Sequence, residues 1–165
     1  MKRQTGFTLI ELMVVIGILG ILAGTAIGFQ KRYRERTVGS EALVMMKQVL
    51  EAEIIYFLAH NEFFPTAAEP LGLWVYSDGD PVSVANQQRI LDELKIAVPT
   101  GHSLDFHIQP NFPVPPIPPV PDPTGSPVAI LIQPSSGIRL FPDAPNGIYG
   151  TVSKEGEIKG PVAIP

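Results

Sequence analysis

The first long hydrophobic pattern of the chain runs from residue 7 to residue 29 and is almost continuous. It reads FTLIELMVVIGILGILAGTAIGF, and Glu11 is its single ionisable residue. A helix of this length extends about 35 Å, which exceeds the roughly 30 Å hydrocarbon core of a bilayer. The pattern therefore predicts a membrane-spanning helix. A buried core helix is the alternative, which the small size of the remaining chain disfavours.

The second pattern, in residues 30–60, is amphipathic and predicts that the same helix continues beyond the membrane. It begins with a basic cluster typical of a membrane interface, Lys31, Arg32, Arg34 and Arg36. From residue 37 onward, apolar positions recur at the spacing of one broad helical face. The residues of this face are Val38, Ala42, Leu43, Met45, Met46, Val49, Leu50, Ile54, Tyr56 and Phe57. Asn61, followed by Pro65, marks the predicted end of the helix.

Residues 61–165 predict a globular head with one short helix. We expect Ser83 to be the N-cap of a helix that continues to about Lys95. Its predicted inward residues are Ile90, Leu91 and Leu94.

Five short strands are predicted after this helix. They cover residues 103–109, 127–133, 137–141, 146–152 and 157–163, with a turn near residues 154–156. The alternation of Leu104, Phe106 and Ile108 gives the first strand one buried face. The predicted fold class is therefore α+β. A long amino-terminal helix spans the membrane with its first half and packs its second half against a small antiparallel sheet.

Proline is concentrated between residues 110 and 127, in the run PNFPVPPIPPVPDPTGSP. Such a run favours polyproline II and cannot donate a regular ladder of hydrogen bonds. We therefore expect a stiff loop that covers the head or contacts a neighbouring subunit. A recruitment motif for an aromatic groove is the alternative.

The composition of the chain and the absence of known motifs argue against several classes of function. Hydrophobic residues make up 45% of the chain and charged residues 17%, with a net charge of -4, so nucleic-acid binding is not expected. There is no cysteine, and no sequence signature of an enzyme or of a cofactor site is present. His60, His102 and His107 lack metal-ligand spacing, and 102 and 107 would lie on opposite faces of a strand. Asp78 and Asp80 could suggest calcium but are more typical of a turn, so no metal is predicted.

The segment before the apolar run, MKRQTG, is short, basic and polar. On composition alone, a secretory signal cleaved near Ala23 to Ala26 and an uncleaved signal anchor both remain open. Residues 6–16, GFTLIELMVVI, resemble the processing and methylation motif of type IV prepilins and type II secretion pseudopilins. The stretch YFLAHNEFFP, residues 56–65, is also similar to the end of the helix in these families.

The resemblance implies a set of site residues. A prepilin peptidase would cut between Gly6 and Phe7 and methylate the new amino terminus of Phe7, so that residues 1–6 are a cleaved leader. Glu11 would pair with the Phe7 amine of an adjacent subunit during assembly. A local role is compatible with this, because Thr8 and Glu11 have the spacing of a capping box. Orientation rests on the resemblance, since the basic cluster after the span opposes the positive-inside rule.

Four glycines lie within the span, and Gly20, Gly24 and Gly28 are four residues apart on one helical face. Small residues at this spacing allow membrane helices to approach closely. Ordinary glycine enrichment of membrane helices is the alternative explanation.

The function implied by these features is that of a structural subunit of a type IV pilus-like filament. Its expected partners are copies of itself, other pilin-like subunits, the prepilin peptidase, an inner-membrane assembly platform and the membrane. The precursor would lie in the inner membrane with its head on the outer side, and the assembled filament would be periplasmic or on the cell surface. Two alternatives remain, a pseudopilin of a type II secretion system and a membrane-anchored monomeric binding module.

Overall fold

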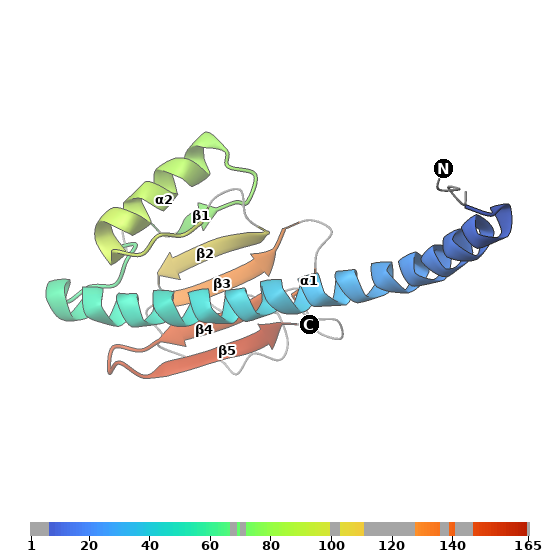
Figure 1. Ribbon diagram of the computed structural model, residues 1–165. Helices are drawn as coiled ribbons and strands as arrows, with labels where there is room; N and C mark the ends of the chain where they lie inside the picture. The colour runs from blue at the N-terminus through green and yellow to red at the C-terminus, as the bar shows by residue number, and fades with distance from the viewer. Residues whose placement is uncertain are drawn as a thin grey trace, which may run out of the picture. The chain divides into compact units, whose positions relative to one another are not determined.

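The computed structural model describes residues 7–66, 69, 72–99, 103–110, 128–135, 139–140 and 147–164. Its longest element is the helix α1, Leu9–His60 (Figure 1). The chain divides into two compact units, Met1–Arg34 and Glu35–Pro165, so that α1 contributes to both. The predicted α+β class, with a long apolar helix followed by an antiparallel sheet, is confirmed.

The second unit is built on a five-stranded antiparallel sheet in the order β1-β2-β3-β4-β5 (Figure 1). Its strands are β1 Leu73–Val75, β2 Leu104–Pro110, β3 Val128–Pro134, β4 Gly147–Val152 and β5 Ile158–Ile164. Each strand pairs with its neighbour in sequence, although α2 lies between β1 and β2 along the chain. The sheet is therefore a simple meander.

One face of the sheet forms the core together with the second half of α1. Phe106 pairs with Ile132, and Ile132 pairs with Ile148, so their side chains make one buried row across three strands. Leu104, Phe106 and Ile108 are all buried as predicted, but His107 on the opposite face is buried as well, so burial in β2 is not confined to one face. From the helix side, the fully buried residues are Ala42, Met46, Val49 and Leu50.

Two large side chains of α1 pack closely against Gly150 in β4. A Cβ atom at this position would lie 2.9 Å from Leu50 Cδ1 and 3.1 Å from Met46 Sδ. Glycine therefore lets the two layers come together where two large side chains of α1 meet the strand.

The predicted end of α1 is confirmed. His60 is its last residue, and Asn61 adopts a left-handed conformation with φ of 57°. The Asn61 amide donates to the Phe57 carbonyl at 2.7 Å, which satisfies one of the last carbonyls of the helix.

The short helix α2, Pro81–Leu94, lies beside β1 at one edge of the sheet (Figure 1). Asp80, not Ser83, is its N-cap, since Asp80 Oδ1 accepts from the Ser83 amide at 2.8 Å. Pro81 suits the first helical position, which needs no amide hydrogen. The Ser83 hydroxyl is buried and instead accepts from the Tyr76 amide at 2.8 Å. The prediction of Ser83 as the cap was therefore wrong.

Two other predictions for the head need correction. Ile90 and Leu94 of α2 are buried as predicted, but Leu91 is 41% exposed. The predicted strand at 137–141 is not found at its described residues, Arg139 and Leu140, and its other residues lie outside the described ones.

The remaining differences are small. The strand β1 was not predicted, because three residues are too short to show a period. The other four strands begin one residue later than predicted, and Pro110, assigned to the proline-rich loop, is the last residue of β2. The rest of that loop, 111–127, lies outside the described residues.

The strand β5 forms one edge of the sheet and has two irregular features. Its pairing with β4 shifts register between Tyr149 and Thr151, and it contains Gly160 and Pro161. The predicted turn before it is confirmed, with Gly156 at a φ of 78°.

Candidate functional site

The start of α1 is organised by a reciprocal capping box between Thr8 and Glu11. The Thr8 amide donates to Glu11 Oε2 at 3.1 Å, and the Glu11 amide donates to Thr8 Oγ1 at 3.3 Å. The Thr8 hydroxyl also donates to Glu11 Oε2, at 2.9 Å. These bonds satisfy amides that have no partner inside the helix and fix where the helix begins.

This arrangement leaves one oxygen of the Glu11 carboxylate available. Oε2 takes both bonds from Thr8, and no described residue donates to Oε1. Phe7, just before the helix, is 75% exposed, and Gly6 lies outside the described residues. Among the predicted site residues, the structure thus brings Thr8 and Glu11 together and holds one carboxylate oxygen open at the end of the helix.

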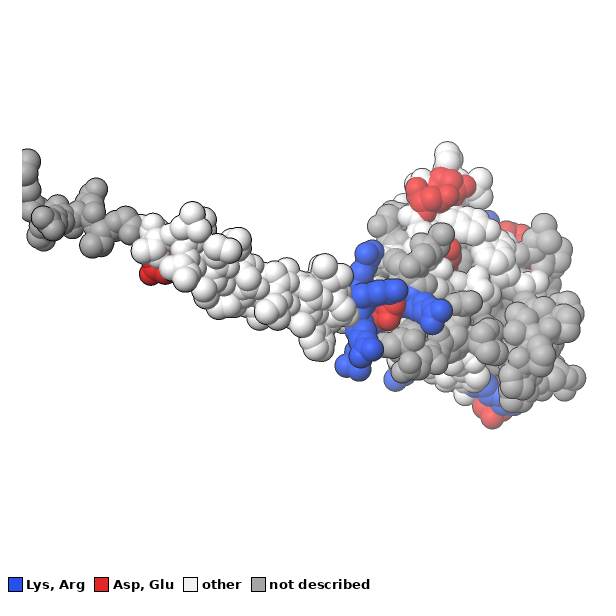
Figure 2. Space-filling view, turned by 90° about the vertical axis from the view of Figure 1, so that its right-hand side faces the viewer, with Lys and Arg blue, Asp and Glu red and all other residues white. Residues whose placement is uncertain are grey.

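The apolar part of α1 is long enough to cross a membrane, and none of its most apolar window is buried within the chain. In Figure 2 this part is white apart from one acidic position, and blue Lys and Arg side chains gather directly after it. Large side chains along it, such as Leu9, Ile21 and Phe29, are each more than 70% exposed. A surface of this kind needs a partner other than water, either lipid or another apolar helix.

The glycines of the span pack against no other segment in the described part of the chain. A Cβ atom at Gly17, Gly20, Gly24 or Gly28 would meet nothing within 4 Å. Their absence of side chains therefore keeps a narrow face of the helix open for a partner, as the predicted close approach of membrane helices requires.

The basic cluster that follows the span is a collar of exposed side chains, Lys31, Arg32, Arg34 and Arg36 (Figure 2). Glu35 lies between them and is buried. Positive side chains at this place can meet anionic headgroups or acidic surfaces of other subunits.

A buried carboxyl group, which the sequence did not indicate, fastens the end of α1 to the head. Glu53 is fully buried, and its Oε2 accepts from the Phe64 amide at 3.1 Å. No described residue forms a hydrogen bond with its Oε1. Burial raises the pKa of Glu53 to about 8, and the bond from Phe64 offsets only part of this. The signal in the sequence that could have indicated this burial was the position of Glu53, one helical turn after Val49 and Leu50 on the apolar face.

The residues considered for metal binding have structural roles. Asp80 caps α2, and Asp78 Oδ1 accepts from the Asp80 amide at 3.2 Å. His107 is buried in β2 and stacks on Trp74 with the ring centroids 3.6 Å apart. His60 stacks on Tyr56, while His102 lies outside the described residues. Within the described part of the chain, no three His, Asp or Glu side chains are grouped as metal ligands.

Comparison with known proteins adds to this geometry. Residues 1–27 match the family model of the prokaryotic N-terminal methylation motif. The chain is 45% identical over 60 residues to a fimbrial protein of Neisseria meningitidis, covering 36% of this chain and 35% of that protein. It is 39% identical over 67 residues to the type IV major pilin protein PilA of Myxococcus xanthus, covering 41% of this chain and 30% of that protein.

A third relative is a protein of a type II secretion system and not a pilin. The chain is 33% identical over 85 residues to the type II secretion system core protein G of Dickeya chrysanthemi, covering 52% of this chain and 55% of that protein. The chain spans about a third of the length of the fimbrial and pilin relatives.

Proposed function

We propose that this chain, a member of the type IV pilin and pseudopilin family by its amino-terminal segment, is a structural subunit of a type IV pilus-like filament. The observation that carries the proposal is the exposed apolar half of α1, which begins with a capped acidic residue and ends at a basic collar. Such a surface is stable in a bilayer and equally stable among copies of itself. A subunit that moves from the membrane into a filament needs an apolar surface that both lipid and other subunits can cover.

Processing is the first step of the proposed function. The prepilin peptidase cuts between Gly6 and Phe7 and methylates the Phe7 amine. The match of residues 1–27 to the N-terminal methylation motif supports this step. The cut removes Lys2 and Arg3 and leaves α1 attached to the head, so the subunit remains anchored in the membrane.

Assembly then uses the two residues at the start of the mature chain. The Phe7 amine of one copy pairs with Glu11 of the next, because a carboxylate within an apolar environment requires a cation. The open Oε1 of Glu11 supports this pairing, since Thr8 already occupies Oε2. Burial of the apolar stalks supplies most of the adhesion, and the charge pair sets their axial register.

The remaining partners and the location follow from this sequence of events. The precursor and the mature pool lie in the inner membrane with the head on the outer side. An assembly platform in that membrane transfers the subunits into the filament, where they meet copies of themselves and other pilin-like subunits. The role is structural, without a cofactor.

Two measurements on the full chain test this proposal. Mass spectrometry of the assembled material should find an N-methylated Phe7 as the first residue, and electron microscopy should find filaments. Replacing Glu11 with alanine should leave the cut intact while lowering the filament yield about tenfold, the equivalent of about 1.4 kcal/mol per contact. An intact Met1 in assembled material would refute the processing step.

A matched control separates charge pairing from helix capping. Thr8→Ala removes the hydroxyl that bonds Glu11 but keeps the carboxylate, so filaments should still form. If Thr8→Ala abolishes filaments as fully as Glu11→Ala, the capping box and not the charge pair is what assembly requires.

A second candidate is the pseudopilin of a type II secretion system. The similarity to the secretion protein of Dickeya chrysanthemi favours it, because that match covers a larger share of both chains than the matches to the pilins. Deletion of the gene separates the two functions. Loss of surface filaments with normal protein export indicates a pilus, and loss of export indicates a secretion pseudopilus.

A further inference from the structure

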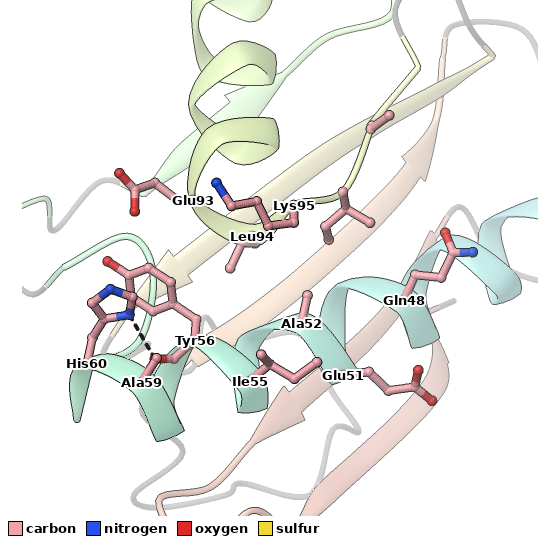
Figure 3. Close-up of a pocket in the computed structure, with 12 residues that line it drawn as sticks. Gln48, Glu51, Ala52, Ile55, Tyr56, Ala59, His60, Glu93, Leu94 and Lys95 are labelled. Atoms are coloured by element: carbon pink, nitrogen blue, oxygen red, sulfur yellow. Dashed lines mark hydrogen bonds between the residues drawn. The ribbon is translucent and has the colours of Figure 1, made fainter.

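A groove on the head lies between the second half of α1 and the end of α2 (Figure 3). Its volume is about 620 Å³, and all of its lining residues belong to the second unit of the chain. The floor is apolar and includes Ala52, Ile55 and Leu94. Ile55 is 68% exposed, although most other apolar residues of this part of α1 are buried or half-buried.

The exposed residues beside the groove repeat at the spacing of a helix seam. Val44, Gln48, Glu51, Ile55 and Leu58 are three and four residues apart along α1, and all five are exposed. Three of them are large and apolar, and Leu58 is 78% exposed. This spacing is that of a seam to which another helix docks.

The rim of the groove carries two carboxylates and one ammonium group. Glu51 and Glu93 stand at its two sides and point outward in Figure 3. Lys95 also lines the rim, but its ammonium donates to the Asp92 carbonyl oxygen at the end of α2. His60 is held against Tyr56, with Nδ1 3.1 Å from the Tyr56 carbonyl oxygen. Glu51 and Glu93 are therefore the two carboxylates that face an incoming partner, and the exposed Lys95 adds one positive charge beside them.

Acidic and basic residues are also unevenly distributed along the whole chain. From residue 37 onward the sequence has fourteen Asp and Glu against six Lys and Arg. The collar at residues 31–36 has four basic residues and one acid. One copy of the chain thus presents the basic surface that the acidic head of another copy attracts.

We propose that the groove is the docking site for the collar of a second copy of this chain, a contact that rests on the proposed filament. The arginine stems and the 75% exposed Tyr33 of the second copy lie on the apolar floor. The guanidinium groups of Arg32 and Arg34 meet Glu51 and Glu93, with the planar geometry that suits carboxylates.

The contact has a geometric consequence for the filament. From Arg34 to Glu51 is about 26 Å along α1, at 1.5 Å for each of seventeen residues. The pairing of the Phe7 amine with Glu11 needs an axial offset of only about 6 Å by the same measure. The collar and the groove therefore join different neighbours from those joined by Phe7 and Glu11, and the two contacts together set the helical geometry.

Charge reversal in the full chain, in cells that assemble it, tests the docking. Glu51→Lys with Glu93→Lys should lower the mass of sedimented filaments about tenfold relative to processed subunit in the membrane. Adding Arg32→Glu and Arg34→Glu to that variant should restore most of the filaments. The matched control, Glu155→Lys with Glu157→Lys, makes the same charge change at exposed positions of the β4–β5 turn and should have little effect.

A second measurement does not depend on yield. The chain has no cysteine, so Tyr33→Cys combined with Ile55→Cys introduces a single pair of thiols per subunit. Mild oxidation of filaments should give covalent oligomers from this variant and none from Tyr33→Cys combined with Ile158→Cys.

The outcomes are distinguishable. The docking is refuted if wild-type filaments form but charge reversal at the groove lowers filament mass no more than the control variant does. It is also refuted if charge reversal in the collar does not restore the filament mass. It is also refuted if the Tyr33 and Ile55 pair gives no covalent oligomers in filaments. Absence of filaments from the wild-type chain refutes the filament function itself, and the docking with it.

Discussion

Glu53 Oε2 accepts a hydrogen bond from the Phe64 amide at 3.1 Å, between two residues eleven positions apart. This bond closes the turn by which the chain leaves α1 and enters the head. It is buried, and the other carboxyl oxygen of Glu53 has no hydrogen-bond partner among the described residues. An acid in such a place is more stable protonated than charged, which makes the stability of the head depend on pH.

The first prediction concerns this dependence. The pKa of Glu53 is raised from 4.5 to about 8 in the folded chain, so folded protein retains a proton that unfolded protein loses above pH 4.5. The contribution is complete below pH 4.5 and decreases as pH rises to about 8, by at most roughly 1.4 kcal/mol per pH unit. Unfolding of the detergent-solubilised chain, followed by circular dichroism between pH 4.5 and 8.5, measures it.

Glu53→Gln should remove this pH dependence, because the amide oxygen still accepts from Phe64 and has no proton to lose. It should also raise the free energy of unfolding at pH 8. Glu51→Gln, at an exposed position of the same helix, is the matched control and should leave the slope unchanged. A wild-type chain whose stability is constant across this pH range would contradict the prediction.

The second prediction compares two glycines with nearly the same backbone angle. Gly72 has φ of 68° and Gly79 has φ of 70°. A Cβ atom at Gly72 would lie 2.3 Å from the Ile108 carbonyl oxygen, whereas one at Gly79 would meet nothing within 4 Å. Gly79→Ala should cost about 1 kcal/mol, from the left-handed conformation alone. Gly72→Ala should cost at least about 2 kcal/mol more, because β1 must move away from β2. Chemical denaturation of both variants measures the difference, and equal losses would contradict the role of close strand approach.

The third prediction concerns the cap of α2. Asp80→Ala removes the acceptor of the Ser83 amide and should lower the free energy of unfolding, because an amide of the first helical turn loses its partner. The pKa of Asp80 is lowered by its hydrogen bonds with Ser83, so this stabilisation is lost as pH falls through the carboxyl range. Asp92→Ala, at an exposed position near the end of the same helix, should have a smaller effect. Thermal unfolding at neutral pH distinguishes the two variants.

The fourth prediction concerns the contact between α1 and β4. Gly150→Ala forces a methyl group against Leu50 and Met46 and should cost about 1 to 3 kcal/mol. Leu50→Ala creates a cavity and should cost about 2 to 5 kcal/mol. Since the new methyl group partly fills that cavity, the double variant should lose at least about 0.5 kcal/mol less than the sum of the single losses. Additive losses in a double-mutant cycle would show that the two sites do not touch.

Most of the features predicted correctly from the sequence are periodic patterns, and the others are local signals at the ends of α1. The apolar run, the amphipathic continuation of α1 and the alternation in β2 each extend over several turns or strand positions, so one exception does not hide the period. Asn61 was identified as the end of α1 because its residue type tolerates the left-handed conformation. The capping box of Thr8 and Glu11 was identified from spacing alone.

The features that were missed depend on single tertiary contacts. Ser83 looked like a cap because serine favours that position, yet its hydroxyl binds Tyr76 while Pro81 allows the helix to start earlier. Glu53 is an acid among apolar residues, and no local pattern reveals that its partner is the amide of Phe64. The groove between α1 and α2 joins segments about forty residues apart, which no period of the sequence connects.

The irregular edge strand β5 affects whether the sheet of one chain can extend into the sheet of another. Pro161 has no amide hydrogen, and the shifted register beside it bends the strand away from a flat edge. Proline and an irregular register are features that disfavour the addition of a further strand at a sheet edge. If the chain is concentrated in a membrane, as the proposed function requires, this edge disfavours cross-β fibrillation and leaves association through the apolar helix.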